Sequence, residues 1–482
     1  MTDTNEVSES AAKTPPKVVA HFTRAERAAR GKAARAEVPR STHADIDFPP
    51  HRDAIALLEE QAVSRVPELV PIRYGRMLVS PFAFYRGGAL IMASDLSRVP
   101  HSGLRVQLCG DAHLSNFGMF GSPERELVFD INDFDETAPG PWEWDVKRLA
   151  ASFAVATREL GFSDKERRTV VLETVRSYRE AMGAFAAMHN LDVWYSHLSV
   201  EEALRTFTSG VDPKRLKRAQ ADVAKVRTKD SMHAFEKLTH VVDGERRIIS
   251  DPPLVVPADE LLPSDVERDA FFDEFRGLIR SYRRTLETDR RHLLEEFRFV
   301  DLARKVVGVG SVGTRAWIGL FLGVDDEDPL FLQMKEAQSS VLEEFVGKSQ
   351  YSNSGQRVVA GQRLMQATSD IFLGWQRVPA GLDGVQRDFY IRQLKDWKGS
   401  FEYEAALPAG ACAYGKMCGW TLARGHARSG DRVAIASYLG KSDVFDQAIA
   451  AFAETYADQN QRDYEALQEA VASGRLTAEL GV

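Results

Sequence analysis

Two stretches in the first third of the chain contain the residue types that phosphoryl transfer requires. One is Cys109-Gly-Asp-Ala-His-Leu-Ser-Asn-Phe117, in which Asp111 and Asn116 stand five positions apart (116 − 111). The other is Val128-Phe-Asp-Ile-Asn-Asp-Phe-Asp135, where an apolar run ends in aspartates. Phosphoryl transfer needs a carboxylate that receives or orients the proton of the attacking hydroxyl. It also needs amide and carboxylate oxygens that hold Mg²⁺ on the phosphates. We therefore predict that Asp111 is the catalytic base and that Asn116 is a metal ligand.

Hydrophobic patterning predicts the elements that must position these residues. Short apolar runs bounded by turn residues indicate strands at 104–108, 116–121 and 126–133. Ser80 followed by Pro81 is typical of a helix start, and this helix would run to about residue 96. Another helix would begin at Trp142 and continue through residue 155, with Asp145 in its first turn, where a carboxylate suits the helix dipole.

A glycine-rich loop follows much later in the chain. Gly308-Val-Gly-Ser-Val-Gly313 could open a dinucleotide-binding unit or could cover the phosphates in a kinase-like nucleotide lobe. The first alternative requires a crossover helix next. Residues 314–324 instead contain two glycines among apolar side chains and predict a strand, with a turn and a second strand after it. We therefore favour the kinase-like alternative and expect Gly308, Gly310 and Gly313 to face the phosphates of ATP.

The second strand of this unit ends in a lysine. Lys335 falls 22 residues after Gly313 (335 − 313). A lysine there can neutralise the α- and β-phosphates while backbone N–H groups of the loop face them. In kinases a glutamate from the next helix holds this lysine. Glu343 and Glu344 are the nearest acids, because the predicted helix 356–368 contains no Glu. We take Glu344 as the partner.

The spacing of these motifs resembles that of the protein-kinase and aminoglycoside-phosphotransferase superfamily. Thr421-Leu-Ala-Arg-Gly-His426 is similar to the run that precedes the catalytic loop in the phosphotransferases. In their pattern a metal-binding Asp is followed, at much the same distance as Asp133 and Asp145 here, by an Asp that ties down the catalytic loop. The resemblance implies that Asp133 binds Mg²⁺. Asp130 stays an alternative because it lies closer to the usual spacing from Asn116.

The motifs occur in an unusual order, with the catalytic segment before the nucleotide lobe. We infer an α+β, kinase-like two-lobe fold that is circularly permuted, with a mostly helical large lobe and a small antiparallel-sheet nucleotide lobe. Permutation is tolerable because termini need only surface positions. The expected parts are a loosely attached basic arm, a catalytic segment with the helical lobe, the nucleotide lobe, and C-terminal helices on the helical lobe, at 1–50, 51–300, 301–400 and 401–482. Residues 163–300 are expected to be mostly helical and to select the substrate.

The whole chain also resembles a bacterial family known as domain of unknown function 2252 (DUF2252). The similarity covers about residues 20–470 and does not imply a substrate. The runs that carry it are Ser80-Pro-Phe-Ala-Phe-Tyr-Arg-Gly87, Gly110-Asp-Ala-His-Leu-Ser-Asn-Phe-Gly118, Asn132-Asp-Phe-Asp-Glu136, Glu143-Trp-Asp-Val-Lys-Arg-Leu149 and Gly355-Gln-Arg-Val-Val-Ala-Gly-Gln-Arg363.

Composition restricts the remaining possibilities. The chain has 482 residues and a net charge of −8, which argues against a general nucleic-acid binder. We find no apolar run long enough for a membrane span and no apolar signal core in residues 1–17. Three cysteines, an odd number, indicate reduced thiols. We expect a cytoplasmic protein.

These observations favour an ATP- and Mg²⁺-dependent phosphotransferase acting on the hydroxyl of a small molecule. A nucleotide-binding scaffold without transfer, or AMP transfer on the same fold, are the alternatives. A metallophosphoesterase is less compatible, because Gly110-Asp-Ala-His113 has no His-rich continuation. Three arginines (Arg73, Arg76 and Arg86) either contact a phosphate or an acidic substrate, or pair locally with carboxylates and aromatic rings.

Overall fold

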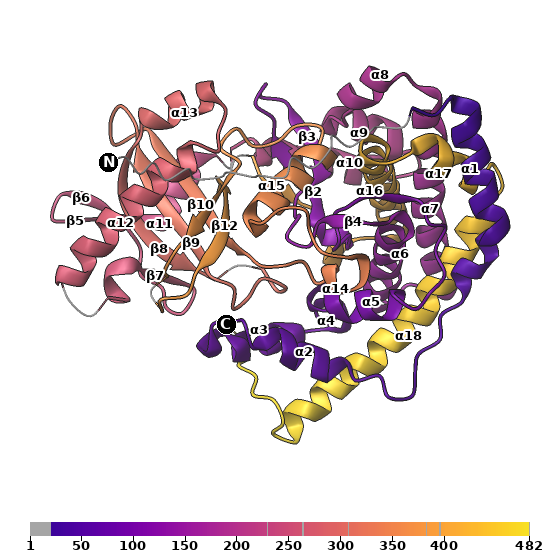
Figure 1. The fold of residues 1–482 in the computed structure, drawn as a ribbon, viewed down its shortest axis with the longest axis horizontal. Helices are drawn as coiled ribbons and strands as arrows, with labels where there is room; N and C mark the ends of the chain where they lie inside the picture. Colours follow the sequence, from indigo (N-terminus) through magenta and orange to yellow (C-terminus); the bar gives the residue numbers. More distant parts are fainter. Residues whose placement is uncertain are drawn as a thin grey trace, which may run out of the picture.

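A six-stranded sheet and a set of long helices form the two sides of the molecule, and the segments with the predicted site lie between them (Figure 1). The computed structural model describes residues 21–228, 230–262, 265–306, 308–381, 383–394 and 397–481. Helices predominate and the paired strands are antiparallel, so the fold is of the mixed α and β type that the sequence predicts.

The large sheet has the strand order β11-β12-β10-β9-β8-β7. The strands are β7 (Val255–Pro257), β8 (Arg298–Lys305), β9 (Ala316–Leu322), β10 (Pro329–Ala337), β11 (Gly374–Val378) and β12 (Arg387–Gln393). The strand predicted at 314–324 and the following strand that carries Lys335 are confirmed, with ends shifted by a few residues. The glycine-rich loop joins the neighbouring strands β8 and β9, and Lys335 lies on the central strand β10.

Both faces of this sheet are covered by segments that precede residue 300. Helix α11 (Ser231–Leu238) packs Phe235 against Ile318 and Leu320. Helix α12 (Asp265–Arg283) packs Phe275 on the face that carries Met334. The predicted boundary at 300 is therefore wrong, because these residues complete the core of the sheet. A hairpin of β5 (Thr239–Val242) and β6 (Glu245–Ile248) also interrupts the region predicted to be mostly helical.

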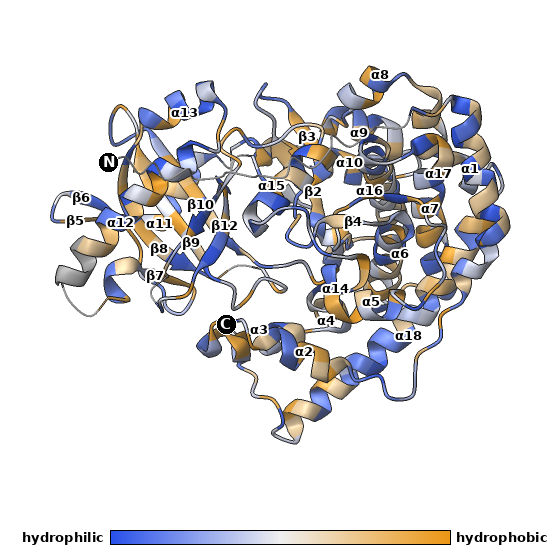
Figure 2. Ribbon diagram, viewed as in Figure 1, coloured by the Kyte–Doolittle hydropathy of each residue, from blue (hydrophilic) through white to orange (hydrophobic). Residues whose placement is uncertain are grey.

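Long helices form the other side of the molecule. They are α6 (Trp142–Glu159), α7 (Asp164–Ala187), α16 (Pro408–Ser429), α17 (Arg432–Leu439) and α18 (Val444–Ala472). Helices α7 and α16 approach so closely that a Cβ atom at Gly419 would lie 2.2 Å from the carbonyl oxygen of Thr174. Hydrophilic and hydrophobic residues alternate along α18, as expected for a helix with one covered side (Figure 2). The described helices include none that is both long and apolar enough to cross a membrane.

The N-terminal segment is packed on the helical side. Helix α1 (Arg24–Glu37) begins with a capping box between Thr23 and Glu26. A Cβ atom at Gly31 would lie 2.0 Å from the carbonyl oxygen of Ala434 in α17. The prediction of a loosely attached arm is therefore wrong for residues 21–50, because small residues allow α1 to pack closely. Residues 1–20 lie outside the described part of the chain.

The next segment forms helices α2 (Ala54–Ala62), α3 (Val70–Met77), α4 (Pro81–Gly87) and α5 (Ala89–Leu96). The predicted start at Ser80 is confirmed, since its hydroxyl accepts a hydrogen bond from the amide of Ala83 at 3.1 Å. The single helix expected from 81 to 96 is broken into α4 and α5, because Gly88 leaves the helical conformation.

Short strands between the two sides flank the segment that contains Asp111 and Asn116. Strand β1 (Arg105–Leu108) pairs with β4 (Ala138–Pro141). Strands β2 (Phe117–Gly121) and β3 (Leu127–Ile131) form the predicted hairpin, and β13 (Gly399–Ser400) pairs with β2. The other described helices are α8 (Asn190–Tyr195), α9 (Val200–Phe207), α10 (Pro213–Val226), α13 (Thr288–Glu295), α14 (Glu343–Val346) and α15 (Ser354–Met365). The described cysteines form no disulfide.

A buried lysine in α6 gives the fold a testable pH dependence. Burial lowers the pKa of Lys147 to about 7, against the opposing charges of Glu143 and Asp45, and its ammonium lies 4.4 Å from the ring centroid of Phe452. Between pH 7 and 10 the unfolded chain binds the extra proton, so the free energy of unfolding should rise with pH, by about 2–3 kcal/mol from this group.

The substitution Lys147→Met should remove this contribution and stabilise the protein at pH 7. Urea unfolding at pH 7 and pH 9.5 measures the difference in slope between the two proteins. Lys165→Met, at an exposed position of α7, is the matched control and should keep the wild-type slope. Equal slopes for the wild type and Lys147→Met would contradict the prediction.

Candidate functional site

Asp145 anchors the segment between β1 and β2 that carries Asp111 and Asn116. Its carboxylate accepts hydrogen bonds from the amides of Cys109 at 2.8 Å and Gly110 at 3.1 Å, and His426 Nε2 lies 3.1 Å away. Gly110 has a φ of +87°, and a Cβ atom there would lie 2.2 Å from the carbonyl oxygen of Glu136. Only glycine suits this position. Asp145 thus ties down the start of the loop that carries Asp111.

Asp111 is held by an arginine from the same helix as Asp145. Arg148 Nε and Nη2 lie 2.9 Å and 2.7 Å from Asp111 Oδ1. Burial raises the pKa of Asp111, and the Arg148 guanidinium opposes this rise. Arg148 lies one turn after Asp145, so α6 fixes both ends of the loop with one face. The sequence reasoning missed Arg148, although its three-residue spacing from Asp145 was a usable signal.

Asn116 and Asp133 approach the same space as Asp111. The Nδ2 group of Asn116 donates to the carbonyl oxygen of Asp111 at 2.8 Å. Its amide oxygen has no hydrogen-bond donor among the described residues, so it is available as a ligand. Burial raises the pKa of Asp133, and the neighbouring charge of Asp135 adds to the rise. A cation placed here would therefore relieve an unfavourable concentration of negative charge.

Lys335 enters the site from β10 and pairs with an aspartate that the sequence reasoning did not select. Its Nζ atom lies 2.6 Å from Asp135 Oδ2 and 3.8 Å from Asp133 Oδ2. The hydroxyl of Tyr390 donates to Asp135 Oδ1 at 2.6 Å. Burial alone would raise the pKa of Asp135, but Lys335 and Tyr390 outweigh it and lower the pKa to about 2. Lys335 and Asp135 therefore form a charged pair at neutral pH.

The prediction that Glu344 holds Lys335 is wrong. Glu344 is exposed on the single-turn helix α14, and its neighbour Glu343 lies 3.5 Å from Arg357. In α15 the position facing the site is Arg357, which donates to the carbonyl oxygens of Asp135, Thr137 and Gln338. The positively charged Arg357 cannot neutralise Lys335, so the counter-charge of Lys335 comes from the loop after β3.

The structure also places Asp130 away from the other candidates. Asp130 is buried in β3, and its carboxylate accepts hydrogen bonds from Arg424 Nη2 at 2.5 Å and from the amide of Ala367 at 3.0 Å. All of these partners belong to α16 and the end of α15. The carboxylate is occupied in the interior, so the alternative assignment of Asp130 as a metal ligand does not fit the structure.

The glycine-rich loop is fastened at both edges. The hydroxyl of Ser311 donates to Asp135 Oδ2 at 3.2 Å, which joins the loop to the Lys335 pair. On the other edge, Arg76 donates to the carbonyl oxygen of Gly308 at 2.6 Å and the amide of Val66 donates to that of Gly313 at 2.8 Å. Gly313 has a φ of +87°, and a Cβ atom there would lie 3.0 Å from Arg65. Helices α2 and α3 therefore hold the loop against the site.

These groups surround one polar cavity of about 170 Å³. Five of the predicted site residues line it: Asp111, Asn116, Asp133, Gly308 and Gly310. Lys335 lies directly behind Asp135, and Gly313 lies at the end of the loop. The arginines of α2–α4 and the segment after β10 complete the wall, with Arg65, Arg73, Arg86, Glu336 and Gln338 among the lining residues.

The cavity contains two kinds of oxygen that can bind Mg²⁺, an amide oxygen and carboxylate oxygens. In the described part of the chain no group of three His, Cys, Asp or Glu residues is arranged to hold a metal ion. A site for Mg²⁺ must therefore combine the amide oxygen of Asn116 with the carboxylate of Asp133 and take its remaining ligands from water and phosphates. This small protein contribution is normal for Mg²⁺. The residues present fit such an ion.

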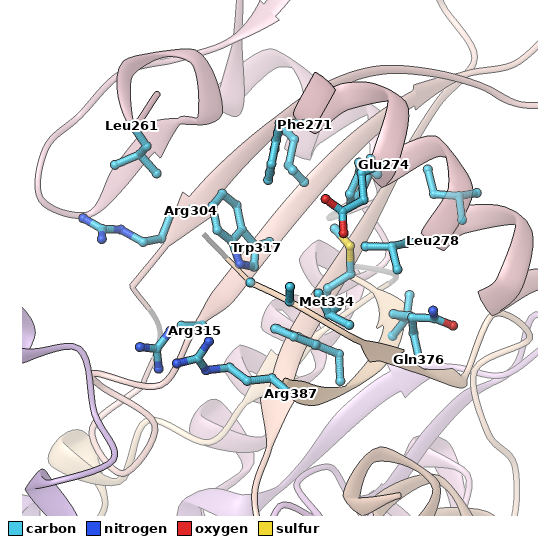
Figure 3. Close-up of a pocket in the computed structure, with 18 of the residues that line it drawn as sticks. Leu261, Phe271, Glu274, Leu278, Arg304, Arg315, Trp317, Met334, Gln376 and Arg387 are labelled. Atoms are coloured by element: carbon cyan, nitrogen blue, oxygen red, sulfur yellow. The ribbon is translucent and has the colours of Figure 1, made fainter. Parts of the chain in front are cut away.

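A larger apolar cavity of about 430 Å³ lies on the opposite face of the sheet (Figure 3). Phe271, Trp317 and Met334 line its interior, while Arg304, Arg315 and Arg387 lie along one side. Successive side chains of a strand point to opposite faces of the sheet. The cavity that Met334 lines therefore lies on the face opposite to the side chain of Lys335. Each of its arginines pairs with a carboxylate, namely that of Glu68 or Asp383. This cavity is separate from the polar site.

Comparison with known proteins gives one match. The family described as "Uncharacterized protein conserved in bacteria (DUF2252)" matches residues 65–470, which include all the site residues predicted from the sequence. No curated protein and no solved structure matches the chain significantly.

Proposed function

We propose that this chain, which belongs to the DUF2252 family, is an ATP- and Mg²⁺-dependent phosphotransferase with a kinase-like arrangement in permuted order. One observation carries the proposal. Lys335 of β10 lies within 4 Å of Asp133 and Asp135, although about 200 residues separate the lysine from the aspartates, and Ser311 of the glycine-rich loop contacts the same carboxylate. Loop, lysine, metal-binding acid and catalytic acid thus occupy one site.

Each group has a distinct role in this proposal. The backbone of the loop at Gly308 and Gly310 faces the phosphates, and Lys335 balances their charge. Asn116 and Asp133 would hold Mg²⁺, which neutralises charge on the phosphates when bound. Asp111, held in place by Arg148, orients the acceptor hydroxyl and takes its proton. Catalysis then rests on positioning and charge neutralisation, which suits a site built from rigid strands and a tethered loop.

A small cavity of about 80 Å³ offers a place for the base of the nucleotide. Met119, Asn132, Arg392 and Leu394 line it. Arg392 donates to the carbonyl oxygen of Asn132 at 3.0 Å, so the end of β12 and the segment carrying Asp133 meet here. We place the base in this cavity because it adjoins β12, the strand that pairs with the Lys335 strand β10.

The proposed permutation has support where α16 meets β1. The amide of Gln107 donates to the hydroxyl of Ser429 at 3.2 Å, and a Cβ atom at Gly430 would lie 2.5 Å from Val106. A chain joined directly from the end of α16 to β1 would run through the sheet, α16, the Asp111 loop and Asp133. That is the order of the kinase superfamily, so a single change of connection accounts for the motif order of this chain.

Isothermal titration of ATP with Mg²⁺ tests the nucleotide site. The wild type should bind ATP. Lys335→Met should bind it at least about tenfold more weakly, because the phosphates lose their contact with the buried ammonium of Lys335. Lys348→Met, at an exposed lysine after α14, is the matched control and should bind as the wild type does. Failure of the wild type to bind ATP would contradict the proposal, as would equal affinity of wild type and Lys335→Met.

Two alternatives on the same fold remain distinguishable by product. A scaffold without transfer would bind ATP and release no ADP, whichever acceptor is added. An AMP-transferring enzyme would release pyrophosphate and leave a heavier adduct, visible by intact-mass analysis when the acceptor is the protein itself. Phosphotransfer predicts ADP as the nucleotide product.

A further inference from the structure

Three arginines from helices α2–α4 and their connections form one wall of the polar cavity. Arg65, Arg73 and Arg86 all line it, and none forms an ion pair with a carboxylate of the described chain. Arg73 is fully buried and donates only to uncharged groups, the side-chain oxygen of Gln61 at 2.9 Å and the carbonyl oxygen of Gly87 at 3.1 Å. The local pairing with carboxylates that the sequence allowed is therefore not what holds Arg73.

Several N–H groups of this wall have no acceptor among the residues that the structure describes. They are Nε and Nη1 of Arg73, Nε of Arg65 and Nε of Arg86, each of them buried. Buried donors are nearly always paired in folded proteins, and a buried charge requires a counter-charge. Burial lowers the pKa of Arg73, and the adjacent charge of Arg65 adds to the effect. An oxyanion in the cavity would satisfy these donors and the charge at once.

In the apolar cavity, by contrast, the arginines do have carboxylate partners. Arg304, Arg315 and Arg387 each have a carboxylate partner at hydrogen-bonding or ion-pair distance. The polar cavity also contains carboxylates, but Arg148 holds Asp111 and Lys335 holds Asp135. Of the other acids that line the cavity, Glu336 pairs with Arg315 and Arg387, and no described carboxylate lies within ion-pair distance of Arg65, Arg73 or Arg86.

We propose that Arg65, Arg73 and Arg86 form an oxyanion site that binds a phosphate or carboxylate group of the acceptor. This proposal rests on the proposed function, because it assigns the substrate class of the same site. Arg86 and Asp111 line the same cavity, so the anion and the reacting hydroxyl would be neighbours. The phosphates of ATP have Lys335, the loop and Mg²⁺ as their own partners. The acceptor is therefore an anionic small molecule with a hydroxyl near its charged group.

Titration with inorganic phosphate tests the site directly. The wild type should bind phosphate, and Arg73→Gln and Arg86→Gln should each raise the Kd by about tenfold or more, since each removes a charge-assisted donor. The matched control is Arg428→Gln, which removes an arginine whose Nε also lacks a partner but which lies on α16 outside the cavity. Arg86 is half-buried and forms none of the described hydrogen bonds, so Arg86→Gln keeps the test valid if Arg73→Gln does not fold.

Repeating the titration with a saturating non-hydrolysable ATP analogue and Mg²⁺ identifies the source of the anion. Phosphate that still binds, with nucleotide affinity unchanged in Arg86→Gln, supports an acceptor site. Phosphate that the analogue displaces, or a wild type that binds no phosphate, overturns the proposal, as does equal phosphate affinity in all variants. Arginine-dependent phosphate binding in a protein that binds no ATP would refute the proposed function and leave the oxyanion site standing.

Discussion

Asp111→Asn is expected to lower the rate of transfer by about 10²–10⁴-fold while leaving the affinity for ATP nearly unchanged. In the proposed mechanism this carboxylate takes the proton of the acceptor hydroxyl, and Arg148 fixes its orientation. An amide in its place keeps the size but cannot accept the proton. In the proposed site the nucleotide contacts come from Lys335 and the loop, so ATP binding should survive.

Two measurements separate this effect from a loss of structure. Asp111→Asn leaves the buried guanidinium of Arg148 without its counter-charge, so the free energy of unfolding should fall, and urea unfolding checks that the variant is folded under the assay conditions. Asp273→Asn, at an exposed position of α12, provides the matched control and should retain full activity. Transfer that persists in Asp111→Asn at the wild-type rate would remove Asp111 from the mechanism. Loss of ATP binding in the same variant would point to a role in the nucleotide site instead.

The second large effect is a contrast between two aspartates three residues apart. Asp130→Asn should destabilise the protein by about 3–5 kcal/mol, because it leaves the buried guanidinium of Arg424 without its counter-charge. Asp133→Asn should leave stability unchanged or raise it, since burial and Asp135 already disfavour the charge of Asp133. It should, however, abolish the effect of Mg²⁺ on ATP binding.

Urea unfolding and titration of ATP with and without Mg²⁺ measure both halves of this contrast. The two variants carry the same substitution in one hairpin and its following loop, so each is the control of the other. A stable Asp130→Asn that loses the Mg²⁺ effect would reverse the assignment. If Asp133→Asn binds Mg²⁺ and ATP as the wild type does, the metal ligand lies elsewhere in the cavity.

Local patterns predicted most of the elements near the site. The hairpin of β2 and β3, the start of α4 at Ser80 and the strand of Lys335 follow from alternation, capping residues and turn residues, which depend on neighbours within a few positions. The region from 231 to 300 was less predictable. Its short strands and helices owe their positions to the two faces of a sheet whose other strands come later in the chain.

The partner of Lys335 shows the limit of reasoning by position in the sequence. Glu344 is near in sequence but lies on an exposed turn, whereas Asp135 is 200 positions away (335 − 135) and 2.6 Å distant. The assignment of Asp130 as a metal ligand is wrong for a related reason. Side chains alternate along β3 and the following loop, so the acids point in different directions, and only the packing of α16 decides that Asp130 meets Arg424.

The sequence by itself determined the chemical residues of the candidate site and their local setting. The spacing of Asp111 and Asn116, the glycine loop before a strand and the lysine on the next strand are local features, and each predicts a backbone conformation that the structure contains. Tertiary structure alone decided which charges meet. The pairs of Lys335 with Asp135 and of Arg148 with Asp111, and the unpaired arginines of the cavity wall, depend on long-range packing. The reason is that Coulomb energy and desolvation depend on distance in space and on burial, and neither can be read from order along the chain.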